Sequence, residues 1–360
     1  MSDISRFLDH HDQTSLASAL KKVHPSFDAS AFLADITPGL MNIPLKERMR
    51  KTTHCVHQHL SLPLDLAFMA LINAGPHISG DFTGMVLSDY VEVYGLEHPD
   101  LSLPALKELT QYGSAEFAIR PFIKRYPNET MAFLLDLSLD DNHHCRRLAS
   151  EGTRPRLPWS FHLKDFIKDP SPCWPLLSNL MQDDSLYVRK SVANHLNDIS
   201  KDNPDLVFDF LKPFDQQNPH TKWITKHALR SLIKDAHPRV FGFLGFSQKP
   251  RLKNVSLTLN SDTITMGSYL AYEISLTSDA TKSQKLAIDV IVHFMKKNGK
   301  QNPKVFKFRE LTIKPNETIT LDGKRAFVPL TTRKYYAGDH AIELMINGQK
   351  SHKQAFNLIF

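Results

Sequence analysis

A ten-residue stretch at positions 150–159, Ser-Glu-Gly-Thr-Arg-Pro-Arg-Leu-Pro-Trp, gathers side chains that can act on a charged ligand. Glu151 supplies a carboxylate, which can stabilise positive charge or orient a water molecule. Arg154 and Arg156 supply guanidinium groups, which suit phosphate, and Trp159 supplies an indole face, which attracts cations. The stretch is either a site for such a ligand or a turn whose tryptophan fills a gap and whose arginines pair with nearby acids.

Two prolines put these side chains on a loop. Pro155 and Pro158 forbid an ordinary helix through the stretch, so it follows the helix that carries Arg146 and Arg147. Loops held by a rigid scaffold often carry function. We therefore expect a scaffold of helices that presents this loop.

A second pair of charges lies upstream, in the string SAEFAIRPFI at 114–123. Glu116 and Arg120 are four residues apart and would share one face of a helix. They form either a surface ion pair or a carboxylate with an arginine beside it for phosphate.

Basic residues also recur in two later strings, 187–205 and 222–230. Asp198 accompanies the first of them and can share its helical face. Repeats would align these basic residues into a stripe that follows a phosphate backbone, or they form a solvated outer face. The residues concerned are Arg189, Lys190, Trp223, Lys226, His227 and Arg230.

The elements that must position these residues are helices up to about residue 245. Apolar residues recur at three- and four-residue spacing, and Pro with Asp or Asn marks helix starts, as at 98–101 and 203–206. Two segments are similar to each other, and their Arg146 and Arg189 are 43 residues apart. Paired helices with a period of about 40–47 residues are typical of HEAT and armadillo solenoids.

The pattern changes near residue 250. Seven short segments alternate apolar and polar residues, as in Ile342, Leu344 and Ile346. Seven strands in about 100 residues indicate an immunoglobulin-like sandwich. We predict a multidomain chain, α then β, with a HEAT-like helical repeat solenoid at 1–248 followed by an Ig-like β-sandwich at 249–360.

Charge is distributed unevenly over the 360 residues, although the net charge is only +6. Residues 1–119 hold 8 Lys and Arg against 14 Asp and Glu, and residues 249–360 hold 18 against 9. A basic domain attracts polyanions by releasing counterions. The C-terminal domain is therefore either an anion-binding domain or a solvated basic surface.

Several functional classes lack support in the sequence. Three scattered cysteines give neither a disulfide framework nor a zinc pair, and a reducing cytoplasm fits them best. No signal peptide or membrane span is visible, and no phosphate-binding loop or nucleophile elbow occurs. His54, His57 and His59 lack a further ligand nearby, so we predict no metal and no cofactor.

Four strings together resemble the AlkC branch of the AlkC/AlkD DNA alkylation repair glycosylases. They are SAEFAIRPFI, LASEGTRPRLPW, YVRKSVANHLNDISKDNPD and TKWITKHALR, in this order. The resemblance covers residues 1 to about 245, and the C-terminal sandwich resembles the Ig-like domain of one AlkC subgroup. It implies hydrolysis of the N-glycosidic bond of cationic bases such as 3-methyladenine and 3-methylcytosine in double-stranded DNA, without base flipping.

The resemblance also implies roles for residues of this chain. Glu116 and Glu151 would lie near the deoxyribose, one of them positioning water, Trp159 would be an aromatic platform, and Asp198 would add a third acidic contact. The sandwich would contact DNA through basic loops and help to encircle the duplex, and the chain would act as a monomer. The expected DNA contacts are Arg120, Arg154, Arg156, Arg189, Lys190, Trp223, Lys226, His227 and Arg230.

Two other functions stay open from the sequence. The chain could be a DNA-binding or scaffold solenoid without activity, or a protein–protein adaptor, a common role of HEAT repeats. An adaptor would not need Glu116, Glu151 and Trp159 together in matching strings. An inactive binder should have lost at least one of them.

Overall fold

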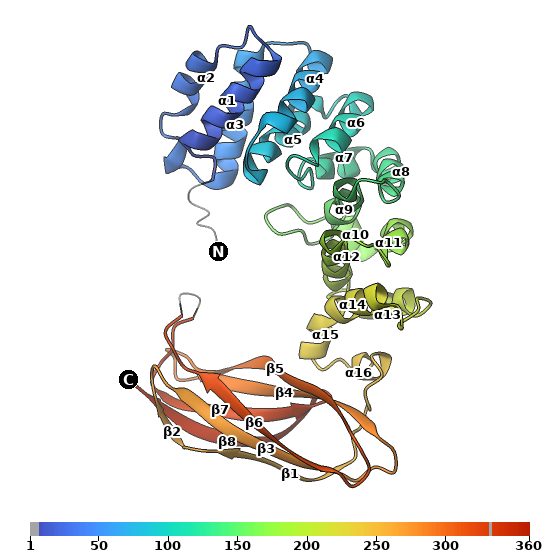
Figure 1. Cartoon of the computed structure of the whole chain (residues 1–360), viewed down its shortest axis with the longest axis vertical. Helices are drawn as coiled ribbons and strands as arrows, with labels where there is room; N and C mark the ends of the chain where they lie inside the picture. Colours follow the sequence, from blue (N-terminus) through green and yellow to red (C-terminus); the bar gives the residue numbers. More distant parts are fainter. Residues whose placement is uncertain (1–6, 331–332) are drawn as a thin grey trace. The chain divides into compact units, whose positions relative to one another are not determined.

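The computed structural model describes residues 7–330 and 333–360, which form two compact units. The first unit, Met1–Ala228, is helical, and the second, Leu229–Phe360, contains two short helices and all the strands (Figure 1). The break in contacts after Ala228 lies before the first strand, which begins at Leu252. The domain limits 1–248 and 249–360 stay a prediction.

The helices follow one another in sequence order, and most are short. The long ones carry the apolar spacing that predicted them, and two begin at the expected prolines, Pro99 and Pro204. Their bounds are α1 His10–Val23, α2 Ala29–Ile36, α3 Leu45–Leu60, α4 Leu64–Ala74, α5 Asp81–Gly95, α6 Pro99–Leu109, α7 Ile119–Arg125, α8 Pro127–Leu137, α9 His143–Gly152, α10 Lys164–Lys168, α11 Trp174–Leu180, α12 Leu186–Ile199, α13 Pro204–Leu211, α14 Pro219–Ala228, α15 Arg230–Lys234 and α16 Val240–Phe243.

Corresponding helices of successive repeats pack on each other, α9 on α12 and α12 on α14. Arg146 and Arg189 make the same contacts in their own repeats. Arg146 Nη1 donates to the carbonyls of residues 140 and 141, at 2.9 and 2.8 Å. Arg189 Nη1 donates to those of residues 183 and 184, at 2.7 and 2.8 Å. The predicted helical repeat is thereby confirmed.

Ion pairs join one repeat to the next. Lys107 Nζ lies 2.7 Å from Asp140 Oδ2, and Arg146 Nε lies 2.6 Å from Asp183 Oδ2. Each of these aspartates also accepts a hydrogen bond from a backbone N–H two residues ahead, at 2.8 Å, at the start of the following helix. The same carboxylate thus binds the backbone of the N-cap residue of one helix, Asn142 or Ser185, and a basic side chain of the preceding repeat, so it links successive repeats of the stack.

The strands of the second unit form two sheets, one of three strands in the order β1-β3-β6 and one of five in the order β2-β8-β7-β4-β5. All neighbours are antiparallel except β2 and β8, and the short β2 was missed by the sequence analysis. The bounds are β1 Leu252–Leu259, β2 Thr263–Thr265, β3 Tyr269–Ser278, β4 Gln284–Met295, β5 Gln301–Ile313, β6 Thr318–Ala326, β7 Gly338–Ile346 and β8 Gln349–Ile359.

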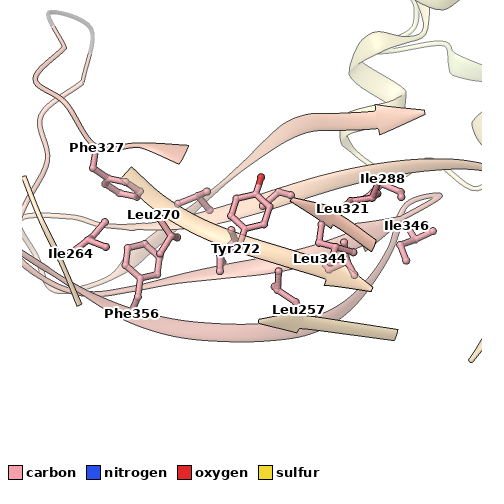
Figure 2. Close-up of a cluster of buried hydrophobic side chains, with 14 of the residues drawn as sticks. Leu257, Ile264, Leu270, Tyr272, Ile288, Leu321, Phe327, Leu344, Ile346 and Phe356 are labelled. Carbon is pink, nitrogen blue, oxygen red and sulfur yellow. The ribbon is translucent and has the colours of Figure 1, made fainter. Parts of the chain in front are cut away.

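The two sheets enclose one apolar core, which confirms the predicted sandwich (Figure 2). Side chains from β3 and β6, such as Leu270 and Leu321, meet side chains from β4 and β7, such as Ile288 and Leu344. Along β4 every second residue from Leu286 onward belongs to this core, which is the period-two pattern of the sequence.

Within the described residues, no single helix is long and apolar enough to cross a membrane, whereas the bent pair Leu45–Leu60 and Leu64–His77, at 115°, passes that test jointly. The same part of the chain holds no group of three His, Cys, Asp or Glu residues arranged for a metal ion. Each of the three clustered histidines has a different hydrogen-bond partner: His54 bonds to Tyr94, His57 bonds to Tyr90 and His59 bonds to an aspartate.

Candidate active site

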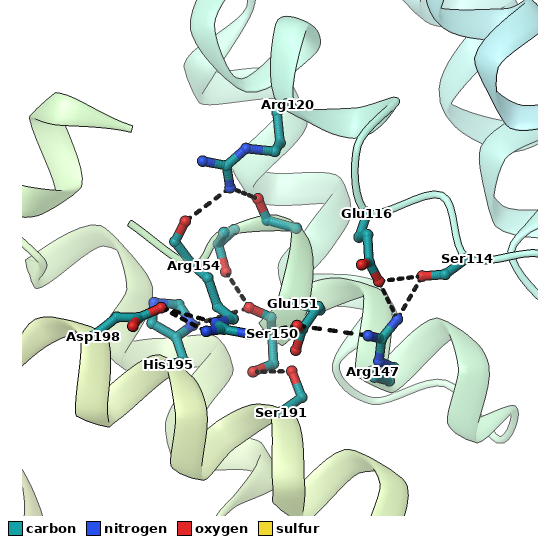
Figure 3. A network of polar contacts seen from close by, with 12 residues as sticks. Ser114, Glu116, Arg120, Arg147, Ser150, Glu151, Arg154, Ser191, His195 and Asp198 are labelled. Atoms are coloured by element: carbon teal, nitrogen blue, oxygen red, sulfur yellow. Dashed lines mark hydrogen bonds and ion pairs between the residues drawn. The ribbon is translucent and has the colours of Figure 1, made fainter. Parts of the chain in front are cut away.

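Five charged side chains of alternating sign form a continuous row in the helical unit (Figure 3). Along the row they are Glu116, Arg147, Glu151, Arg154 and Asp198. They come from the turn before α7, from α9, from the loop after α9 and from α12. The structure therefore brings together the three carboxylates that the sequence singled out.

Glu116 closes one end of the row. Its Oε2 accepts hydrogen bonds from Arg147 and from Ser114 Oγ, the latter at 2.7 Å. The prediction that Glu116 shares a helix face with Arg120 is wrong, because Glu116 lies in a turn and α7 begins only at Ile119. Arg147 is its partner instead, and both side chains are 14% exposed.

Glu151 occupies the centre of the row and is buried. Its Oε1 lies 2.6 Å from Arg154 Nη1 and 3.6 Å from Arg147 Nη2. Burial by itself raises the pKa of this carboxyl, but the two arginines outweigh burial and the pKa is lowered from its ordinary value. Glu151 is therefore an anion held in a low-dielectric place, suited to electrostatics rather than to donating a proton.

Arg154 joins the centre of the row to α12. Its Nε and Nη2 each lie 2.9 Å from Asp198 Oδ2, while Lys201 Nζ lies 2.9 Å from Asp198 Oδ1. Arg154 is only 7% exposed, and carboxylates on both sides engage its guanidinium. The expectation that Arg154 contacts phosphate does not fit this geometry, because its donors are used inside the protein.

Arg120 is wholly buried, although the sequence marked it as a DNA contact. Its Nη1 donates to the carbonyls of Gly152 and Arg154, at 2.9 and 2.8 Å, and its Nη2 donates to that of Phe161 at 2.5 Å. Burial and the nearby Arg154 lower its pKa to about 10. With no exposed surface Arg120 cannot reach phosphate; it ties both ends of the loop that carries Trp159.

His195 lies beneath the row and was missed by the sequence analysis. It is fully buried on α12, and its Nδ1 lies 3.0 Å from the carbonyl oxygen of Ser150, so Nδ1 carries the proton. Burial and the charge of Arg154 lower its pKa to about 3, so the ring is neutral. A lone histidine on an apolar helix face gave no signal in the sequence.

Beside Glu116 the surface opens into a cavity of about 430 Å³. Glu116, Arg147 and Tyr187 line it together with Met85, so the Glu116 end of the row is the end that an external molecule can approach. Arg147 lies 4.8 Å from the centre of the Tyr187 ring.

Trp159 is set apart from the carboxylates. It is 54% exposed, with a backbone φ of 65°, and its indole lines a small apolar cavity with Met49, Met85 and Phe117. Met85 lines both this cavity and the one beside Glu116. The indole therefore lies near the open end of the row without touching a carboxylate.

Family models match both units of the chain. The model for a DNA alkylation repair enzyme matches residues 110–232, which include the whole row, and the model for the C-terminal Ig-like domain of the uncharacterised protein YhaZ matches residues 253–360. The uncharacterised protein YhaZ of Bacillus subtilis is 38% identical over 97% of both chains.

A solved structure agrees with these matches. It is the Pseudomonas fluorescens alkylpurine DNA glycosylase AlkC bound to DNA containing an abasic site analog, 36% identical over 99% of both chains, with a TM-score of 0.92. The chain belongs to the AlkC family. The resemblance found in the sequence is thereby confirmed at the level of family and fold.

The remaining basic residues of this AlkC-type protein lie on or near the surface. Arg156 pairs with Asp202 through Nε and Nη2, at 2.9 and 2.8 Å, and its side chain is 30% exposed. Lys190 is exposed on α12. Their roles in DNA contact stay predictions.

A stacked cluster occupies the neighbouring repeat. The ring of His227 lies 3.8 Å from that of Trp223 and parallel to it, and the Arg189 guanidinium lies 6.0 Å from the Trp223 ring. Lys226 and Arg230 are half-buried. Arg189 of α12 and Trp223 of α14 thus meet between two successive helices of the repeat. The DNA-contacting roles of these residues stay predictions.

Proposed function

We propose that this chain is a DNA glycosylase that hydrolyses the N-glycosidic bond of cationic alkylated bases, of the 3-methyladenine and 3-methylcytosine type, in double-stranded DNA. The observation that carries the proposal is the row of three carboxylates, each paired with an arginine, whose Glu116 end lines an open cavity near the exposed indole of Trp159. The similarity of the whole chain to an alkylpurine DNA glycosylase supports the same conclusion.

The residue types suit this reaction. A base methylated on a ring nitrogen is a cation and leaves without a general acid. The enzyme then has to stabilise positive charge on the sugar and to place a water molecule. Glu116, which lines the open cavity, faces the deoxyribose and orients the water, and Glu151 adds negative potential from behind. Asp198 holds Arg154, which keeps Glu151 in place.

Trp159 serves as a platform for the lesion. An indole that is 54% exposed can lie against the cationic base or sugar and attract it through its ring face. In the proposal the lesion stays in the duplex. Its positive charge is recognised from the side of the DNA backbone, so the base does not have to be flipped out. The chain acts as a monomer in this scheme.

In the proposal, DNA phosphates bind to two groups of basic and aromatic side chains. The first is the cluster of Arg189, Trp223 and His227 together with Lys190. The second is on the sandwich, where Arg325 lies 3.7 Å from the centre of the Phe306 ring and Lys304 and Arg333 lie close by.

These three sandwich cations have no carboxylate partner in the part of the chain that the structure describes. Arg333, burial and Arg325 lower the pKa of Lys304, which reflects mutual repulsion. Among residues 7–330 and 333–360 no carboxylate pairs with Lys304, Arg325 or Arg333. Cations left unpaired by the protein are suited to an external polyanion.

The deciding experiment measures free base released from DNA that contains 3-methyladenine or 3-methylcytosine. We expect release by the wild type and a loss of about 100-fold or more in Glu116→Gln. Glu129→Gln is the matched control, because Glu129 is an exposed acid in the first turn of α8. Binding without release would make the chain an inactive DNA-binding protein and contradict the proposal.

A further inference from the structure

A lysine from a distant helix touches both loops of the candidate site. Lys46, at the start of α3, donates from Nζ to the backbone carbonyl of Trp159 at 2.5 Å, across 113 residues of sequence. The same ammonium lies 4.6 Å from the centre of the Phe117 ring. Phe117 is the neighbour of Glu116, so one cation contacts the loop of the carboxylate and the loop of the indole.

The backbone of the loop is unusual at Trp159, the residue whose carbonyl Lys46 binds. Trp159 has a φ of 65°, in the left-handed region that residues other than glycine seldom adopt. Arg120 fixes the two ends of the loop through the carbonyls of Gly152 and Phe161. Lys46 holds the carbonyl of the very residue whose backbone is unusual.

The contact is also placed to define where the indole points. A hydrogen bond from an ammonium is stronger than one between neutral groups. Lys46 lines the same small cavity as the indole of Trp159, together with Met49 from its own helix. The hydrogen bond thus fixes the backbone of Trp159 to α3, and the indole starts from that fixed backbone beside the same cavity.

We propose that Lys46 is a positioning residue that sets the orientation of Trp159 relative to Glu116. The inference rests on the proposed function for its effect on catalysis, whereas its effect on the indole can be measured in the free protein. It assigns a role to the N-terminal helices, since Lys46 lies outside residues 110–232, the part that matches the DNA alkylation repair model.

The matched control lies one turn and a half further along the same helix. Lys51 also donates from Nζ to backbone carbonyls, those of Ile36 and Pro38 at 3.2 and 2.8 Å, but it contacts neither loop. Lys46→Met and Lys51→Met therefore remove the same kind of bond from the same helix. Lys46→Arg keeps a cation that can donate and should restore most of the lost function.

The first measurement is acrylamide quenching of Trp159 fluorescence without DNA, in a Trp174→Phe, Trp223→Phe background where Trp159 is the sole tryptophan. We expect the quenching constant or emission maximum to change in Lys46→Met and to stay unchanged in Lys51→Met. Identical quenching and emission in all three proteins would overturn the proposal, whatever the enzyme does.

The second measurement is single-turnover excision with full-length protein at saturating concentration. Misplacement of a reacting group by about 1 Å can cost up to about 100-fold, so we expect the rate constant of Lys46→Met to fall about 10- to 100-fold with DNA affinity within about twofold. A loss confined to affinity, with a lower salt dependence, would make Lys46 a phosphate contact and overturn the positioning role. A fluorescence change with no excision by any variant, the wild type included, would refute the proposed function alone.

Discussion

The molecule holds two groups of charges that are built in opposite ways. In the row from Glu116 to Asp198, every charge has a partner of opposite sign within the protein. In the cluster of Lys304, Arg325 and Arg333, the described residues provide aromatic rings but no carboxylate. The sequence shows both groups only as charged residues. In the structure, the charges of the row are neutralised by partners within the protein, and those of the cluster are not.

The difference follows from what each group has to do in the proposed reaction. Charges that stabilise a transition state must already point the right way, so the protein has to hold them with its own counterions. Charges that attract a polyanion gain by releasing small ions when the polyanion arrives, so internal counterions would compete. In the proposed reaction, the paired row serves catalysis and the unpaired cluster serves binding.

The largest effect is expected from removing Arg154, which joins Glu151 to Asp198. Arg154→Met strands the carboxylates of Glu151 and Asp198 in a buried place, and breaking a buried ion pair in this way costs about 3–5 kcal/mol. Urea unfolding of the helical unit measures the change in the free energy of unfolding. A change as small as that of Arg125→Met, whose partner Glu97 is exposed, would show that the row is not held internally.

The buried His195 makes the folding stability of the helical unit depend on pH. Its pKa is about 3 in the folded protein and near its ordinary 6.5 in the unfolded chain, so the unfolded state takes up the proton first. The stability that neutral His195 contributes is present above pH 6.5 and is lost as the pH falls from 6.5 towards 3, by about 1.4 kcal/mol per pH unit.

His195→Asn tests this dependence, because it keeps an N–H near the carbonyl of Ser150 and does not titrate. The difference in the free energy of unfolding between wild type and variant should become smaller as the pH falls from 6.5 towards 3. A difference that stays constant from pH 7 to pH 4 would mean that His195 has the same pKa in the folded protein as in the unfolded chain.

The sandwich cluster should respond in binding rather than in stability. Arg325→Gln and Arg333→Gln are each expected to weaken DNA binding severalfold and to lower the salt slope of log K by about one. Lys282→Gln, an exposed lysine outside the cluster, is the control. Unchanged affinity at low salt would show that the unpaired cations do not meet DNA.

The sequence predicted the helical repeat, the sandwich and the set of carboxylates, because periodic patterns and local strings carry that information. It did not predict the partners. Glu116 and Arg120 have helical spacing, but the turn before α7 separates them, and Arg120 turns inward to carbonyls. Contacts such as Lys46 with Trp159 cross 113 residues, and no local pattern encodes them.

Arg156 belongs neither to the paired row nor to the unpaired cluster, so it tests the distinction between them with the smallest expected effect. Its guanidinium is paired with Asp202, as in the row, yet its side chain is 30% exposed, as a binding cation should be. Asp202→Asn removes the counterion and leaves the arginine in place.

If Arg156 serves binding, the variant should bind DNA about twofold more tightly, with a steeper salt slope, because a freed cation can release one more ion from the DNA backbone. If Arg156 belongs to the internal network, affinity stays the same and only stability falls, by at most about 1 kcal/mol for an exposed pair. Fluorescence anisotropy with undamaged duplex at several salt concentrations separates the two outcomes, since it measures binding without any contribution from excision.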